Sequence, residues 1–416
     1  MNNDGVIETP EQTGGIDSVP PVPRSKLRPV YILITTGAVF LILAAGLFIY
    51  FAPASWVSDD SYILSPGSAT NTANAIFVDG TDSFPPEGEI AYTTVSITRK
   101  VTLLDWIRAK RDATKDLINP AIIDGGRTVG ETRQVTQFQM EQSQSTAELV
   151  ALNFLGYAIV PEIEGAFVTR LVEESPAEEF LQLGDLIVEV NKKKVRSADD
   201  LGDQIKAREP GESVEIKFLR SSASLGGSGA DEDAVSLTSE ITLSEHPEID
   251  DTGFLGVVIE TPIRADAPFE ITIDVGSVRG PSAGLAFALS ILDVITEGEL
   301  TGGIRIATTG TIDRFGNVGP VGGVPQKTEA AVRSGIKLFL VPPGEFAIAT
   351  EIANGRISVR CVQTFSDAIL VLEEFGGNGV DIAERNGLPP LEFSKDLIDE
   401  EDGVLTCAEA QMPKSG

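Results

Sequence analysis

The chain has a single histidine among its 416 residues, and this scarcity removes several kinds of catalytic site. His246 stands in a Ser-Glu-His-Pro stretch with no glycine-flanked serine beside it, so the sequence offers little from which an ordinary Ser-His-Asp triad could be built. One histidine and two cysteines, Cys361 and Cys407, also form no cluster that could hold zinc. The two cysteines form either one disulfide in an oxidising compartment or two unpaired thiols. We expect no metal and no cofactor.

Basic residues are scarce too: Lys and Arg number 32 against 62 Asp and Glu, a net charge of −30. Nucleic-acid binding requires clustered Lys and Arg, so nucleic acid is not an expected partner. The sequence contains no Gly-x-x-x-x-Gly-Lys-Ser/Thr loop, which excludes a P-loop ATPase within it. Hydrophobic residues make up 42% of the chain, enough for ordinary cores in several domains.

Charged residues are absent from Val30 to Phe51. At about 1.5 Å per residue this run spans roughly 33 Å, enough to cross a bilayer. Basic residues precede it and aspartates follow it: Arg24, Lys26, Arg28, Asp59 and Asp60. We therefore expect one transmembrane helix over residues 30–52, a disordered cytoplasmic tail over 1–29, and an extracytoplasmic remainder. The alternative is a signal peptide cleaved near Ala52-Pro53-Ala54, for which the apolar run is too long.

A glycine-flanked serine is the feature that points to chemistry, in the stretch Gly280-Pro281-Ser282-Ala283-Gly284. The apolar run that follows predicts a buried helix ending near Gly298, with Ser282 at its N-terminus. Free N–H groups there, including that of Ala283, are suited to an oxyanion, while Gly280 and Gly284 leave room for a substrate backbone. The alternative is a tight turn in which the serine only caps the helix.

A lysine completes the pattern, because Gly322-Gly323-Val324-Pro325-Gln326-Lys327 opens a second helical segment that stops at Gly335. Burial and the helix dipole would both lower the pKa of Lys327 toward a value useful for a general base. With no histidine nearby, lysine is the expected activator of Ser282.

These two motifs resemble the proteolytic domain of the Lon protease family, which carries Gly-Pro-Ser-Ala-Gly and Gly-Gly-x-x-x-Lys. The stretch from Ala307 to Gly323 is similar to the family's connecting hairpin. The resemblance implies that Ser282 is the nucleophile, Lys327 the base and Thr309 the hydrogen-bond partner of the lysine. It also implies an α+β domain over residues 250–375 and a homo-oligomeric ring. One departure is Arg279, at a position where many Lon proteases have an acidic residue.

Residues 155–245 resemble a bacterial PDZ domain of the HtrA type, chiefly through Glu174-Ser175-Pro176-Ala177 and Leu183-Gly184-Asp185-Leu186-Ile187. Ser175, Pro176 and Glu178 predict the start of a short helix. Such domains bind peptides by strand addition. The segment Leu155-Gly156-Tyr157 weakly resembles the carboxylate-binding loop of such domains, and its N–H groups are suited to bind a carboxylate. The alternative is a plain helix-to-strand turn.

The remaining segments contain no motif that indicates a catalytic or binding function. Residues 53–154 form a juxtamembrane α+β region, with strands over 75–78 and 90–98 and helices over 103–111 and 140–154. Two further segments are expected to be solvated: the Ser/Gly-rich insertion 221–233 and the acidic tail 376–416.

The order of anchor, PDZ-like unit and Lon-type domain resembles the bacterial membrane-bound, PDZ-containing Lon-like proteases, the YlbL group. The expected fold class is therefore α+β and multidomain, with a single N-terminal transmembrane helix. The resemblance implies an ATP-independent serine endopeptidase in the bacterial cell membrane, acting on extracytoplasmic proteins or peptides. The PDZ domain would recruit substrates or regulate the protease. The alternative is a catalytically silent membrane-tethered scaffold whose PDZ domain carries the function.

Overall fold

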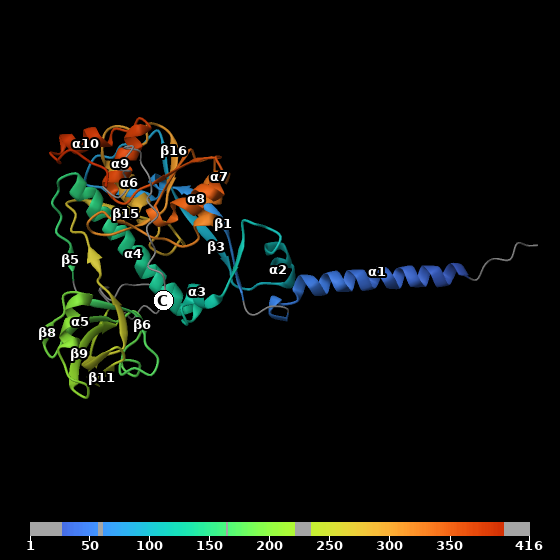
Figure 1. Ribbon diagram of the computed structural model, residues 1–416, viewed down its shortest axis with the longest axis horizontal. Helices are drawn as coiled ribbons and strands as arrows, with labels where there is room; N and C mark the ends of the chain where they lie inside the picture. The colour runs from blue at the N-terminus through green and yellow to red at the C-terminus, as the bar shows by residue number, and fades with distance from the viewer. Residues whose placement is uncertain (1–26, 57–60, 164, 221–233, 395–416) are drawn as a thin grey trace, which may run out of the picture.

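The computed structural model describes residues 27–56, 61–163, 165–220 and 234–394 (Figure 1). Helix α1 (Leu27–Phe51) extends away from the body of the protein. Its segment Tyr31–Phe48 is long and apolar enough to cross a membrane, and all of it is exposed. Residues 1–26 of the predicted N-terminal tail, the insertion 221–233 and Cys407 lie outside the described residues, whereas residues 27–29 of that tail already belong to α1. Cys361 is disulfide-bonded.

The main sheet has six strands in the order β20-β19-β16-β3-β1-β4. The strands are β1 (Tyr62–Asn71), β3 (Glu89–Thr98), β4 (Asp116–Ile118), β16 (Arg305–Thr308), β19 (Leu338–Val341) and β20 (Ser358–Cys361). β3 runs parallel to β16, whereas β1 and β4 pair antiparallel. Residues 53–154 are therefore no separate juxtamembrane region, because their strands and the later ones share one sheet.

Helix α6 (Gly284–Ile295) packs against this sheet at β3 and β16, and the long helix α4 (Val129–Phe154) packs against α6. α6 is almost wholly buried, as its apolar sequence predicts. α4 begins eleven residues before the helix expected from Met140, and a capping box of Thr128 and Glu131 starts it. Its early turns carry too many polar residues for the apolar period to reveal them.

Further elements surround the sheet. The helices are α2 (Leu103–Ala109), α3 (Pro120–Asp124), α7 (Val324–Arg333), α8 (Phe346–Ala353), α9 (Phe365–Glu374) and α10 (Gly379–Arg385). The small strand pairs are β2 (Ile76–Asp79) with β15 (Glu270–Ile273), and β17 (Thr311–Ile312) with β18 (Val318–Gly319). The expectation of a solvated tail over 376–416 is wrong for α10, because Ile382 and Ala383 are buried against the core. Residues 395–416 lie outside the described part.

A second sheet, in the order β10-β9-β7-β6-β13, forms a β-rich unit with its own core. Its elements are β6 (Ala166–Leu171), β7 (Leu186–Val190), β8 (Lys193–Lys194), α5 (Ala198–Lys206), β9 (Ser213–Arg220), β10 (Val235–Thr242), β11 (Ser244–His246), β12 (Ile249–Phe254) and β13 (Val257–Glu260). The unit thus continues past the expected boundary at 245, because β13 pairs with β6. The chain enters and leaves it through a paired ribbon, β5 (Glu162–Ile163) and β14 (Ile263–Arg264).

The helix predicted to start at Ser175 is absent from the described part of this unit, where residues 173–180 form turns. The Ser175 hydroxyl donates to the Gly256 carbonyl at 3.2 Å instead of capping a helix. A contact distant in sequence therefore overrides the local capping pattern.

Candidate active site

The serine loop precedes α6 and is fastened to α4. The Gly280 N–H donates to the Thr136 carbonyl at 2.9 Å, and the Ser143 hydroxyl donates to the Pro281 carbonyl at 3.0 Å. Ser282 is partly exposed and lies two residues before the first helical residue of α6, Gly284. Helix α4, which the sequence did not connect with the site, thus positions the serine.

Lys327 lies in the second turn of α7, with only 3% of its surface exposed. Burial lowers the pKa of Lys327 to about 8, against a smaller opposing attraction from Glu345. A buried ammonium ion loses its hydration, so the neutral amine becomes accessible near physiological pH. Lys327 therefore has the protonation behaviour of a general base.

Thr309 joins the lysine to the serine loop. The Lys327 Nζ donates to the Thr309 Oγ1 at 3.0 Å, and the Thr309 hydroxyl donates to the Ser282 carbonyl at 3.3 Å. The threonine is fully buried, and its own N–H donates to the Leu340 carbonyl of β19. The central sheet thus fixes the Thr309 side chain between the two motifs.

Ser282 and Lys327 both line one cleft of about 670 Å³. β3 forms one wall through Tyr92 and its neighbours, and α4 forms another through Thr132 and Thr136. Within the described residues no hydrogen bond joins the Ser282 hydroxyl to the Lys327 amine, which donates to Thr309 instead. The fold nevertheless brings the two sequence motifs to a single concave site.

Some backbone N–H groups near Ser282 already donate hydrogen bonds, and others do not. The N–H groups of Gly280 and Gly284 already donate, to the carbonyls of Thr136 and Pro281. Those of Ser282 and Ala283 have no acceptor among the residues that the structure describes. Only these two N–H groups are therefore available to a developing oxyanion.

Gly284 is needed for packing and not, as the sequence suggested, for access of a substrate backbone. A Cβ at this position would meet the Ile312 Cγ2 and the Ser143 Oγ, each at 2.9 Å. The glycine therefore allows close packing of α6, rather than leaving room for a substrate. Gly280 has a φ of +93° and open space around an added Cβ, so the loop needs its conformational freedom.

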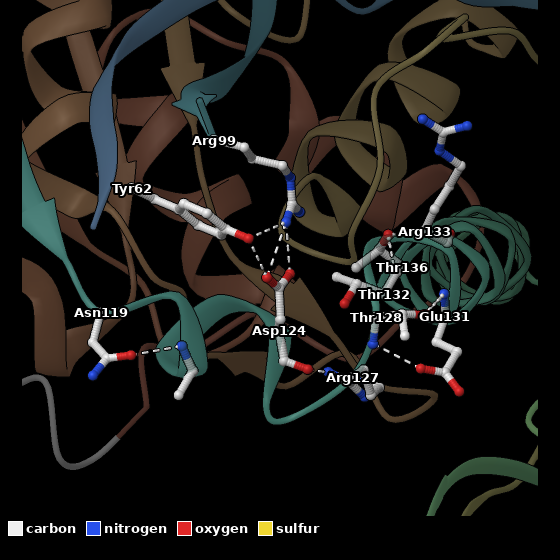
Figure 2. A network of polar contacts seen from close by, with 11 residues as sticks. Tyr62, Arg99, Asn119, Asp124, Arg127, Thr128, Glu131, Thr132, Arg133 and Thr136 are labelled. Atoms are coloured by element: carbon white, nitrogen blue, oxygen red, sulfur yellow. Dashed lines mark hydrogen bonds and ion pairs between the residues drawn. The ribbon is translucent and has the colours of Figure 1, made fainter. Parts of the chain in front are cut away.

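A partly buried ion pair, of which Arg99 lines the cleft, was not found from the sequence. The Arg99 Nη1 donates to both carboxylate oxygens of Asp124, at 2.7 and 3.0 Å, and the Tyr62 hydroxyl donates to the Asp124 Oδ2 at 2.7 Å (Figure 2). Burial opposes ionisation of Asp124, but the hydrogen bonds from Arg99 and Tyr62 prevail and hold its pKa below the ordinary value. Arg99 directly follows β3, Asp124 ends α3 and Tyr62 begins β1, so no local signal could reveal the cluster.

Comparison with known proteins agrees with this geometry. Residues 259–366 match the family described as Lon protease (S16) C-terminal proteolytic domain. The chain carries a Lon-type proteolytic domain. Residues 137–235 match the PDZ domain family, so the PDZ-containing, Lon-like architecture predicted from the motifs is confirmed. The strands β1 and β3 precede the match of the Lon-type domain yet complete its sheet.

The curated relatives match over this part only. The Lon protease of Haemophilus influenzae is 26% identical over 138 residues, covering 32% of this chain and 17% of that protein. The Lon protease of Lachnoclostridium phytofermentans is 36% identical over 94 residues, covering 22% of this chain and 11% of that protein. The chain thus spans less than a fifth of the length of these relatives.

A solved PDZ domain, from the SdrC-like protein of Listeria monocytogenes, is 23% identical and covers 23% of this chain and 87% of that chain, with a TM-score of 0.19.

The expected peptide-binding residues Leu155, Gly156 and Tyr157 do not lie on the β-rich PDZ unit. Leu155 caps the end of α4, and Tyr157 packs edge-on against Phe269. The two residues line a small pocket with the end of α6 and with α10 of the Lon-type domain. This segment is a turn that follows α4, and the alternative interpretation of a plain turn is therefore the right one.

The edge strand β13 runs alongside helix α5, and this β13–α5 edge of the PDZ unit is better placed to bind a peptide. The Gly253 N–H donates to the Arg208 carbonyl just after α5, and the Ala198 N–H at its start donates to the Thr261 Oγ1, so strand and helix run alongside each other. The N–H groups of Leu255 and Gly256, just before β13, have no acceptor within the described residues. An edge strand preceded by two unused N–H groups is suited to a peptide carboxyl terminus.

Helix α4 also contacts the PDZ unit. Phe138 stacks on Phe167 of β6, with ring centroids 3.6 Å apart, and the Gln134 side chain donates to the Leu183 carbonyl. Between these two residues stands Thr136, which holds the serine loop through its carbonyl. Helix α4 therefore runs from the PDZ unit to the serine loop (Figure 1).

Proposed function

We propose that this protein is a serine endopeptidase in which Ser282 is the nucleophile and Lys327 the general base. The observation that carries the proposal is the buried Lys327, whose pKa is lowered to about 8, in the same cleft as Ser282. The match of this region to the Lon proteolytic family supports it. Ser-Lys pairing also accounts for catalysis without histidine.

In the first step the neutral Lys327 amine accepts the proton of the Ser282 hydroxyl as its oxygen attacks a peptide carbonyl. The N–H groups of Ser282 and Ala283 stabilise the oxyanion, and Thr309 orients the amine. The lysine then gives its proton to the leaving amine. Water then attacks the acyl-enzyme as Lys327 accepts its proton, the bond from the acyl carbon to the Ser282 oxygen breaks, and Lys327 returns the proton to that oxygen as the product acid leaves.

The proposal includes hydrolysis without an ATP motor of the chain's own, because the sequence has no P-loop. It also places the N-terminal side of α1 in the cytoplasm and the cleft outside, in a bacterial membrane. The charge difference across the apolar run supports that orientation. The disulfide at Cys361 supports an oxidising compartment. The substrates would then be extracytoplasmic proteins or peptides.

The pH dependence of hydrolysis tests the base. Below its pKa Lys327 is protonated and cannot accept the serine proton, so kcat/KM should rise about tenfold per pH unit and level off above about pH 8. The measurement uses the full chain in non-ionic detergent with an unfolded protein labelled with a quenched fluorophore. Ser282→Ala serves as the control and should be inactive throughout. Equal rates for Ser282→Ala and wild type would favour the scaffold function instead.

The β13–α5 edge of the PDZ unit gives a second prediction, that peptides bind there through a free C-terminal carboxylate. Amidating the C-terminus should weaken binding about tenfold, since one charge-assisted interaction is lost. Gly256→Ala should weaken binding similarly, because its Cβ would collide with Ser175 at 2.1 Å. Gly211→Ala is the matched control: its φ of +84° is close to the +83° of Gly256, but nothing lies within 4 Å of its Cβ. Fluorescence anisotropy that shows equal binding of both peptides would refute the assignment.

A further inference from the structure

The charge of the catalytic cleft differs from that of the whole chain. The protein carries 62 acidic and 32 basic residues. Yet the described residues that line the cleft include no Asp or Glu, while Arg99, Arg133, Arg279 and Lys327 all contribute. A cationic cleft on an anionic chain focuses field lines and attracts negatively charged ligands.

The arginines of the cleft differ in how far they are neutralised. Arg99 is paired with Asp124 at 2.7 Å. In the described part of the chain Arg133 has no ion pair, and Figure 2 shows its guanidinium away from the Asp124 carboxylate. The Arg279 Nη1 donates only to the Ser277 carbonyl, at 2.9 Å. Arg133 and Arg279 are both exposed, so their charges are available to a ligand.

Both arginines stand beside the serine loop. Arg279 directly precedes Gly280 and lies three residues before Ser282. Arg133 lies one turn before Thr136 on α4, and the Thr136 carbonyl accepts from the Gly280 N–H. A substrate backbone at Ser282 would therefore place neighbouring side chains within reach of guanidinium groups.

We propose that Arg133 and Arg279 make this cleft select substrates with aspartate or glutamate next to the scissile bond. The inference rests on the proposed protease function and adds the class of side chain that the site accepts. Guanidinium groups bind carboxylates with two parallel hydrogen bonds, which favours acidic side chains over their amides. Lys327 is buried and its amine donates to Thr309, so the exposed arginines carry this selection.

The test compares quenched fluorescent peptides that differ only in Asp, Asn or Lys beside the cleavage site. Wild-type protein should cleave the Asp peptide with a kcat/KM about tenfold above the Asn peptide, an order of magnitude typical of two partly exposed charge pairs. The ratio should fall toward one in the double variant Arg133→Gln/Arg279→Gln. It should reverse in favour of Lys in Arg133→Glu/Arg279→Glu. Arg264→Gln, an exposed arginine outside the cleft, is the control and should retain the wild-type ratio.

Binding to the full-length Ser282→Ala protein separates this inference from the protease function, because it requires no turnover. Fluorescence anisotropy should show preferred binding of the Asp peptide, and the preference should shrink as salt screens the charges. Equal binding of Asp and Asn peptides would overturn the arginine assignment even if wild-type protein hydrolyses both. Preferred Asp binding without any hydrolysis by wild type would support the arginines and contradict the protease function.

Discussion

Replacing Lys327 by methionine is expected to lower kcat/KM for peptide hydrolysis at least about a thousandfold, since the general base is lost and no histidine can substitute. The same change should raise the stability of the folded protein. Methionine has a similar length and fills the same buried space without carrying a charge. A gain in stability with a loss of activity is the signature of a buried catalytic lysine.

The sign of the stability change follows from the pKa. The folded-state pKa of Lys327 is lowered to about 8 from an ordinary 10.5, so between these values the unfolded chain binds more protons. Stability due to this group therefore rises with pH through that window, and at neutral pH the buried lysine is destabilising, on the order of 3 kcal/mol. Loss of the hydrogen bond to Thr309 offsets part of the gain.

Denaturant unfolding followed by tryptophan fluorescence measures this effect. Lys327→Met should be more stable than wild type near neutral pH, and the difference should vanish above about pH 10.5. The exposed Lys337, replaced by methionine in the same way, is the matched control and should change neither stability nor hydrolysis appreciably. A destabilised Lys327→Met protein at neutral pH would mean that the lysine is held as a charged structural group.

Replacing Thr309 by valine is the second large expected effect. Valine has the same shape but no hydroxyl, so it removes the hydrogen bonds to the Lys327 Nζ and to the Ser282 carbonyl together. We expect kcat to fall about 10- to 100-fold through misplacement of the amine, with a loss of about 1–3 kcal/mol in stability. Steady-state kinetics and denaturant unfolding of the full chain in detergent check both values.

Thr309→Ser separates positioning from packing. Serine keeps the hydroxyl and loses one methyl group, so it should restore most of the wild-type kcat while remaining somewhat destabilised. If serine and valine reduced kcat equally, the hydroxyl would have no positioning role. A Thr309→Val protein with wild-type kcat would lead to the same conclusion.

Much of the candidate site could be predicted because its parts are local in sequence. The motifs around Ser282 and Lys327 each combine a glycine-rich turn with a helix start, and such patterns are readable from a few residues. The apolar run after Ser282 predicted α6 for the same reason. What places Thr309 between the two motifs is the parallel pairing of β16 with β19, a contact distant in sequence.

The division of the chain into domains could not be read from the sequence. Strands β1 and β3 complete the sheet of the Lon-type domain from the far side of the PDZ unit, and only pairing across that insertion reveals it. Similarly, β13 follows the expected end of the PDZ unit, so the carboxylate-binding loop was sought at Leu155 instead. A local pattern carries no information about which distant strand will pair with it.

The most direct test of the central claim is covalent labelling of the full chain by a fluorophosphonate, followed by mass spectrometry of the modified peptide. The account predicts a single adduct on Ser282. Its rate of formation should rise toward about pH 8, and both Ser282→Ala and Lys327→Met should abolish it. A folded wild-type protein that acquires no adduct, or acquires it with equal rate in Lys327→Met, would contradict a lysine-activated serine.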